Sequence, residues 1–140
     1  MTPQMTPQMP PNVDAVFKTF PPQARLGLNH LRALIFARAA DLPTIGRVVE
    51  DLRWGQPAYL TPDTGAACSL RLGLAPGDDF ALFVHCKTSL IQSFAAGPGA
   101  LHRIIGTRAV VFRTPEDIIA PALSLLIGQA LTYHVAKNAT

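Results

Sequence analysis

The spacing of apolar residues changes along the chain, and each change marks a different kind of secondary structure. At Val13–Phe20 and Gln23–Ala40 the apolar residues recur at helical spacing, which predicts two helices, the second with a single apolar stripe. The apolar residues of Thr44–Leu52 have the same spacing and predict a third, short helix. The chain is therefore expected to open with helices.

Alternation of apolar and polar residues follows in the middle of the chain and predicts strands. The predicted strands are Ala58–Thr61, Ala66–Leu72 and Phe80–Cys86, which turn residues separate. Because successive side chains of a strand point to opposite sides of a sheet, Phe83 and His85 share one side. Phe80, Leu82, Val84 and Cys86 point to the opposite side, which is expected to be buried.

The last third of the chain returns to helices around one more strand. Thr88–Ala96 predicts a short helix and Arg108–Arg113 an apolar strand. Thr114 and Pro115 form a strong helix start, so a helix is predicted from there to about Lys137. This order predicts an α+β fold, an antiparallel sheet of about four to five strands with helices packed mainly on one face.

Composition separates a tail from a single domain. Residues 1–11 read MTPQMTPQMPP, and proline at this density prevents regular hydrogen bonding, so a disordered N-terminal tail is predicted. Residues 12–137 are predicted to form one domain, a number that a length of 140 residues favours. Only 15% of the residues are charged, which excludes disorder of the whole chain.

Charge and hydropathy argue against two classes of partner. The formal net charge is only +3 and the basic residues are scattered, so no nucleic-acid-binding patch is predicted. The longest apolar stretch, Ile118–Leu131, is too short to span a bilayer, and the N-terminus lacks the features of a secretory signal. These observations predict a cytoplasmic protein that binds neither nucleic acid nor membranes.

Both cysteines are predicted to be inert. Two cysteines in a chain of this length are typical of a reducing compartment rather than of a disulfide framework. Cys68 and Cys86 occupy the apolar phase of their strands, which predicts buried thiols, and His85 points away from Cys86, so the two cannot share a metal ion. The chain has no recognisable catalytic or phosphate-binding motif. No catalytic residue, metal or other cofactor is therefore predicted.

One side of the predicted sheet carries an unusual set of polar and aromatic residues. If the strands pair as a hairpin, Arg71 and Ser69 lie on the side of His85, with Tyr59 beside them and Trp54 and Gln56 at the edge. Arginine offers a fork of donors and tryptophan a stacking surface, so this side could bind a small anionic or planar ligand. A solvated outer sheet face and a surface for self-association remain open as alternatives, as does a Trp54 that fills the junction between helix and sheet. The candidate ligand-binding residues are Trp54, Gln56, Tyr59, Ser69, Arg71, Phe83 and His85.

Three segments of the chain resemble a known family. These are RWGQPAY at Arg53–Tyr59, FALFVH at Phe80–His85 and ALTYH at Ala130–His134. In this order and spacing they resemble the YdhG-like family, a bacterial domain of unknown function, over Val13–Val135. The resemblance implies an α+β domain with an antiparallel sheet, and one branch of the family is described as a frataxin-like intracellular iron chaperone.

The residues and the resemblance together favour a non-catalytic module that binds a small ligand or another protein. An iron-binding chaperone and a small enzyme that uses His85 as an acid or base are the alternatives. The acidic residues are dispersed and form only local pairs, which speaks against iron delivery.

Overall fold

The helices and strands of the protein surround one central sheet. The computed structural model describes residues 6–77, 79–85, 90–97, 99–100, 102–106 and 108–138, with the backbone alone for residues 85 and 136–138. Within these ranges the helices are α1 (Pro11–Phe17), α2 (Pro22–Ala40), α3 (Leu90–Ala96), α4 (Ala120–Leu131) and α5 (Tyr133–Asn138), with short 3₁₀ turns η1 (Pro43–Ile45) and η2 (Pro115–Asp117). The strands are β1 (Val49–Arg53), β2 (Gln56–Leu60), β3 (Ser69–Leu74), β4 (Phe80–His85), β5 (Arg103–Ile105) and β6 (Ala109–Phe112).

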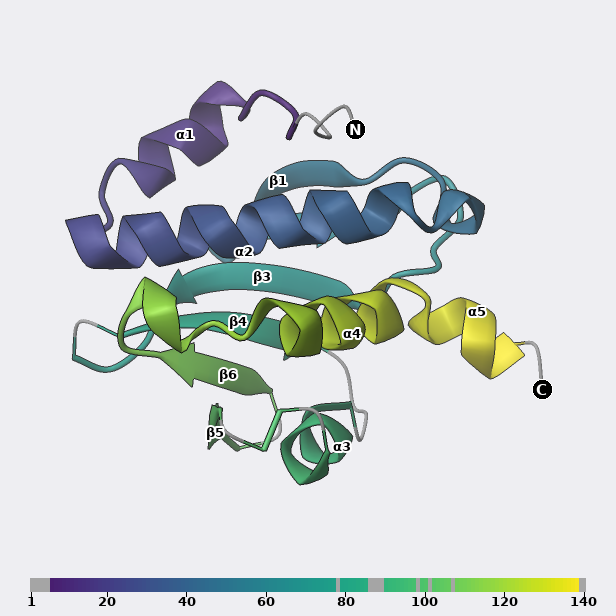
Figure 1. Cartoon of the computed structure of the whole chain (residues 1–140). Coiled ribbons are helices and arrows are strands. Elements are labelled where there is room, and N and C mark those ends of the chain that lie inside the picture. Colours follow the sequence, from purple (N-terminus) through teal and green to yellow (C-terminus); the bar gives the residue numbers. More distant parts are fainter. Residues whose placement is uncertain are drawn as a thin grey trace, which may run out of the picture.

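The sheet is antiparallel throughout, and its strands lie in the order β1-β2-β3-β4-β6-β5. Helices α2 and α4 pack against each other over one face of the sheet (Figure 1). Helix α1 packs against β1 and β2, and α3 packs against α4. The predicted α+β class is thus confirmed, with six strands among the described residues in place of four to five.

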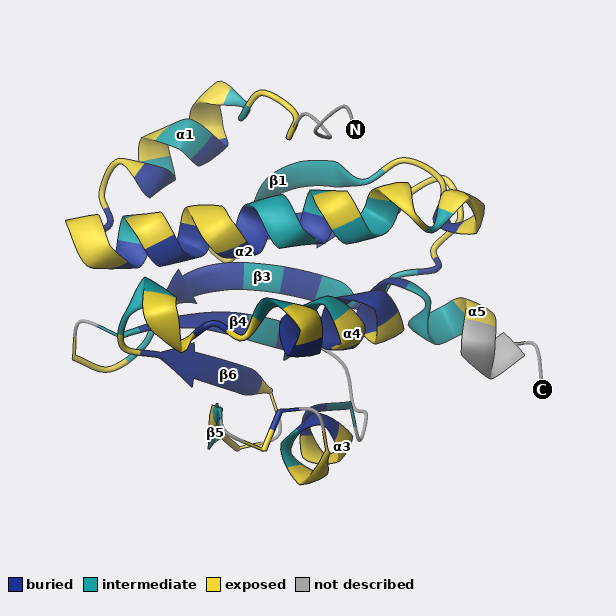
Figure 2. Ribbon diagram, in the orientation of Figure 1, coloured by how far each residue is buried: buried dark blue, intermediate teal, exposed yellow. Residues whose placement is uncertain are grey.

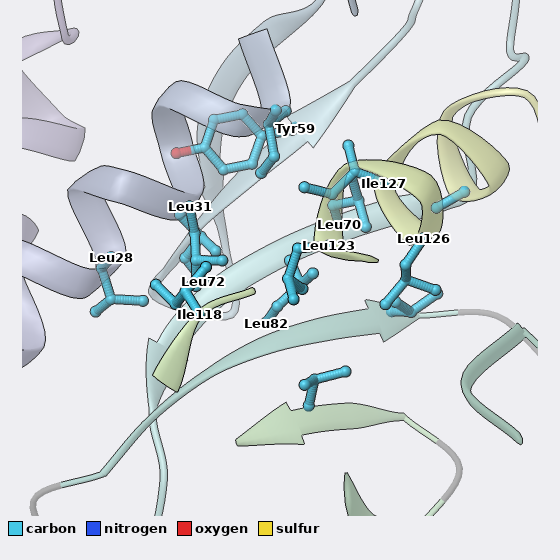
Figure 3. Close-up of a cluster of buried hydrophobic side chains, with 14 of the residues drawn as sticks. Leu28, Leu31, Tyr59, Leu70, Leu72, Leu82, Ile118, Leu123, Leu126 and Ile127 are labelled. Carbon is cyan, nitrogen blue, oxygen red and sulfur yellow. The ribbon is translucent and has the colours of Figure 1, made fainter. Parts of the chain in front are cut away.

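The main hydrophobic core lies between the helices and the sheet. Helix α2 contributes Leu28, Leu31 and Ile35 at the helical spacing that predicted it, and the central strands are buried along most of their length (Figure 2). Every second residue of the strands packs against these side chains from the sheet. Side chains of α4 complete the same core beside α2 (Figure 3). The side chains labelled in Figure 3 are Leu28, Leu31, Tyr59, Leu70, Leu72, Leu82, Ile118, Leu123, Leu126 and Ile127.

The predicted helix at Thr44–Leu52 is wrong. This segment forms the turn η1 and then strand β1, which pairs with β2 from Val49↔Leu60 to Arg53↔Gln56. The apolar residues have helical spacing, but backbone pairing across a two-residue turn outweighs that local pattern.

The predicted long C-terminal helix is divided into three pieces. The residues at Thr114 that predicted a helix start begin only the short turn η2. There the Asp117 carboxylate accepts hydrogen bonds from the N–H groups of Arg113 and Thr114. Helix α4 begins later, with Pro121 in its first turn, where a missing N–H costs nothing. Strand β5 was not predicted, because three residues are too few to show alternation.

The N-terminal segment contacts the domain in the part that is described. The carbonyl oxygen of Pro7 accepts a hydrogen bond of 2.6 Å from Arg32, and Met9 packs against the core. Helix α1 then starts at Pro11, one residue before the predicted start of the domain. Residues 1–5 of the predicted tail lie outside the described residues.

A buried ion pair joins α2 to the β1–β2 hairpin. The Arg32 guanidinium donates to both oxygens of the Glu50 carboxylate, at 2.6 and 2.8 Å, and only 6% of Arg32 is exposed. The hydroxyl of Tyr59 donates to the same carboxylate at 2.8 Å. Burial, with the charge of Glu50 adding to it, raises the pKa of Tyr59 well above its usual value, so the hydroxyl remains a donor.

Replacement of Glu50 by Gln should therefore destabilise the fold strongly. Removing one charge of a buried pair leaves the other uncompensated, which costs roughly 3–5 kcal/mol of unfolding free energy. Urea unfolding followed by circular dichroism measures this loss. The exposed Glu116→Gln change is the control and should stay within about 0.5 kcal/mol of wild type. A Glu50→Gln variant as stable as the control would contradict the structural role given to this pair.

Candidate functional site

The face of the sheet turned away from α2 and α4, here called the outer face, carries the candidate site. Strand register places Gln56 and Ala58 of β2, Arg71 and Gly73 of β3, and Phe83 of β4 on it. A second, smaller hydrophobic cluster lies on the same face, built from Ala81, Ala109 and Val111 with Ala75 and Phe83 beside it. None of these five residues belongs to a helix of the described part of the chain.

Gln56 and Gly73 hold the side chain of Arg71. The Arg71 guanidinium donates through Nη1 to the Gln56 Oε1 at 3.0 Å. The side chain of Gln56 lies against Gly73, where a Cβ atom would come within 2.4 Å of its Nε2. The absence of a side chain at Gly73 thus makes room for the amide that positions Arg71.

Arg71 is partly desolvated, and its donors are incompletely used. Burial, together with the positive charge of Arg108, lowers the pKa of Arg71 below its usual value. Its Nε atom is buried without a hydrogen-bond partner among the described residues. The guanidinium carbon lies 5.8 Å from the centre of the Phe83 ring, within reach of a cation–π contact.

The Arg71 guanidinium on the outer face is therefore within the electrostatic reach of Arg108, and neither arginine has an acidic partner among the described residues. In the described ranges no ion pair includes Arg71 or Arg108, whereas Arg53 pairs with Asp51 and Arg103 with Asp79. Neighbouring like charges disfavour each other unless an anion lies between them. This surface is thus chemically suited to bind a carboxylate or a phosphate.

The register agrees with the predicted strand phase for part of the candidate set. Ser69 is opposite His85 and Arg71 is opposite Phe83, so these four backbone positions share the outer face. The side chain of His85 lies outside the described residues. Tyr59 was expected on the same face, but it is fully buried on the helix-covered face and bound to Glu50.

The expectation that Trp54 fills the junction between helix and sheet is wrong. Trp54 lies in the two-residue turn between β1 and β2, and 84% of it is exposed. It cannot support the core from this position. Trp54 therefore lies at the exposed tip of the hairpin, away from the strand residues that are buried against the helices.

The expectation of a free thiol at Cys68 is also wrong. Cys68 is buried, as predicted, but it is disulfide-bonded. Cys86 lies outside the described residues. Disulfides persist in oxidising surroundings, so this bond weighs against the reducing compartment expected from the cysteine count.

Among the described residues, no group of three or more His, Cys, Asp or Glu side chains could hold a metal ion. Across those same ranges, no helix combines the length and the hydropathy needed to cross a bilayer.

A cavity of about 330 Å³ lies at the other edge of the sheet, beside β5, β6 and η2. His102 forms one wall, where its Nε2 accepts the N–H of Ile119 at 3.3 Å and its ring contacts Phe94 and Phe112. Its lining residues are His102, Arg103, Val111, Glu116, Asp117 and Ile119.

Sequence reasoning did not single out this cavity, Gly73 or Arg108. The cavity residues come from segments that show no common motif, and only the folded chain brings them together. Gly73 follows directly after the predicted strand Ala66–Leu72 and has no side chain that could point to a chemical role. The alternation of β3 and β4, in contrast, was a usable signal for Arg71 and Phe83.

In comparisons with known proteins, no family model, no curated protein and no solved structure matches the chain. The YdhG-like resemblance therefore rests on the sequence segments alone.

His102 should make stability depend on pH on the acid side. Burial lowers the pKa of His102, against the opposing effects of the Gly99 carbonyl and Asp117. Below about pH 6.5 the unfolded chain gains a proton at this residue that the folded chain resists, so stability falls as pH falls through the folded pKa.

Urea unfolding at pH 7.5 and pH 5 measures this dependence. His102→Gln, whose amide oxygen can accept the same N–H of Ile119, should lose less stability between the two pH values than wild type. The exposed His30→Gln variant should lose as much as wild type. Equal losses in wild type and His102→Gln would show that His102 does not contribute.

Proposed function

We propose that this protein is a non-catalytic binding module that holds an oxyanion, a carboxylate or a phosphate, at Arg71 on the outer face. The observation that carries the proposal is the half-buried Arg71 guanidinium, whose Nε lacks a partner within the described part of the chain. An unsatisfied buried donor is costly, and an anion that accepts from it removes that cost. The charge of Arg108 adds attraction for the same ligand.

Several features support a ligand rather than a second copy of the chain on this face. Gln56 orients one side of the Arg71 guanidinium and leaves other donors for a ligand. Phe83 beside it offers an apolar surface to a planar group. A second copy docked face to face would bring the Arg71 guanidinium groups of the two copies together, which like-charge repulsion disfavours.

The family and the location remain sequence-based parts of the proposal. The module is proposed to be YdhG-like on the segments around Trp54, Phe83 and His134. A cytoplasmic location is proposed from the low cysteine count, although the disulfide at Cys68 favours an oxidising compartment. The redox state of Cys68 in acid-quenched cells decides between the two.

Inorganic phosphate and acetate, titrated separately into the full chain at constant ionic strength, test the proposed ligand class. Calorimetry should show saturable binding of at least one of the two anions. Arg71→Gln removes the charged donors and should weaken that binding roughly ten- to hundredfold, since bonds to charged groups contribute about 1.5–3 kcal/mol. Arg47→Gln, which removes an exposed arginine paired with Asp63, is the charge-matched control and should bind as wild type does.

A second pair of variants tests the geometry of the site rather than its charge. Gly73→Ala should push the Gln56 amide aside and break its bond to Arg71, which weakens anion binding while the fold keeps its stability. In a Gln56→Ala background the same change should have no further effect. Wild type that binds neither anion, or Arg71→Gln that binds as well as wild type, would refute the proposal.

A further inference from the structure

The position of Trp54 is unfavourable for a tryptophan, both in its backbone conformation and in its exposure to solvent. Its φ of 56° lies in the left-handed region, and Gly55 beside it has a φ of 73°. Two-residue hairpin turns of this kind favour asparagine or glycine, and a bulky aromatic residue there is strained. Trp54 is also the single tryptophan of the chain and 84% exposed. A residue that stabilises neither the turn nor the core points to a contact outside its own chain.

The cavity beside His102 has the matching chemistry. Val111 and Ile119 give it apolar walls, and Glu116 and Asp117 place two carboxylates on its lining. Arg103, the one cation among the described residues of the lining, is already bound to Asp79 at 2.8 Å. At about 330 Å³ the cavity is at the small end of the range for ligand pockets, a size suited to one large side chain.

The residue next to Trp54 complements the carboxylates. Arg53 is half exposed, and its contact with Asp51, at 3.5 Å, is at the limit of a hydrogen bond. Glu116 is exposed and forms no ion pair within the described residues. The indole N–H is a donor that a carboxylate can accept.

We propose that Trp54 of one copy of this chain inserts into the His102 cavity of a second copy, with Arg53 against Glu116. The strand order places β1 at one edge of the sheet and β5 at the other (Figure 1). The β1–β2 hairpin therefore lies at the first edge and the cavity, which Arg103 of β5 lines, at the second. The two contact surfaces are therefore different, and the assembly is head to tail, a chain or a closed ring of copies. A single inserted side chain buries little surface, so the association is weak and depends on concentration. This proposal does not rest on the anion site.

Two variants that each lack one half of the contact provide the test. Trp54→Asn removes the indole and puts a favoured residue in the turn, so it should fold at least as stably as wild type. Glu116→Arg keeps Trp54 but reverses the charge at the cavity. Each variant alone should sediment as a monomer, at concentrations where the weight-average mass of wild type rises above that of one chain.

Mixing the two variants should restore one contact and no more. The cavity of Trp54→Asn is intact and the Trp54 of Glu116→Arg is intact, so the mixture should give a 1:1 dimer. Because Trp54→Asn contains no tryptophan, its titration into Glu116→Arg should shift the emission of the remaining indole to shorter wavelengths. Leu26→Asn, which removes another exposed apolar side chain, should leave wild-type association unchanged.

Three results would overturn the proposal. Wild type could remain monomeric at millimolar concentration, Trp54→Asn could associate like wild type, or the mixture could show neither dimer nor emission shift. The double change Arg53→Glu with Glu116→Arg, which swaps the charges, should restore association that either single change weakens. Anion binding at Arg71 can persist in every one of these variants, so failure here leaves the proposed function standing.

Discussion

The buried pair of Arg32 and Glu50 holds the two layers of the domain in register. Arg32 comes from α2, Glu50 from β1, and Tyr59 from β2 binds the same carboxylate. A buried charge requires a partner with good geometry, so this contact specifies how the β1–β2 hairpin lies against the helix. The carbonyl oxygen of Pro7 accepts a further hydrogen bond from Arg32, which attaches the N-terminal segment to the same ion pair.

The hairpin that this pair anchors serves two surfaces at once. One side of its strands carries Glu50 and Tyr59 into the core, and the other side carries Gln56 to Arg71 on the outer face. Alternation along a strand makes this division possible, because neighbouring residues face opposite layers. Trp54 at the tip belongs to neither side, which is why a contact beyond the chain accounts for it best.

The spacing of apolar residues was enough to predict those helices and strands whose buried side follows directly from that spacing. The alternation of β3 and β4 placed Arg71 and Phe83 on one face, and the apolar stripe of α2 predicted its buried side. The helical spacing of apolar residues gave a wrong prediction at Thr44–Leu52, where pairing of β1 with β2 outweighs the helical pattern.

The candidate site was less predictable because it depends on contacts between segments. The sequence could not show that Tyr59 would lie on the core side with its hydroxyl bound to Glu50. Nor could it show that the side chain of Gln56 would occupy the space beside Gly73. It also could not show the oxidised state of Cys68, because an apolar strand phase predicts burial but not a bond. Arg108 was visible only as one scattered base, and its charge matters through its nearness to Arg71.

The Arg71 Nε–H signal in a ¹⁵N-resolved NMR spectrum tests the central claim most directly. This N–H is a buried donor without a hydrogen-bond partner among the described residues, and an oxyanion at the outer face must change its surroundings. During titration with inorganic phosphate or acetate the account predicts a saturable shift of this signal, while that of Arg47 stays in place. An Arg71 signal that does not move with either anion would contradict the account.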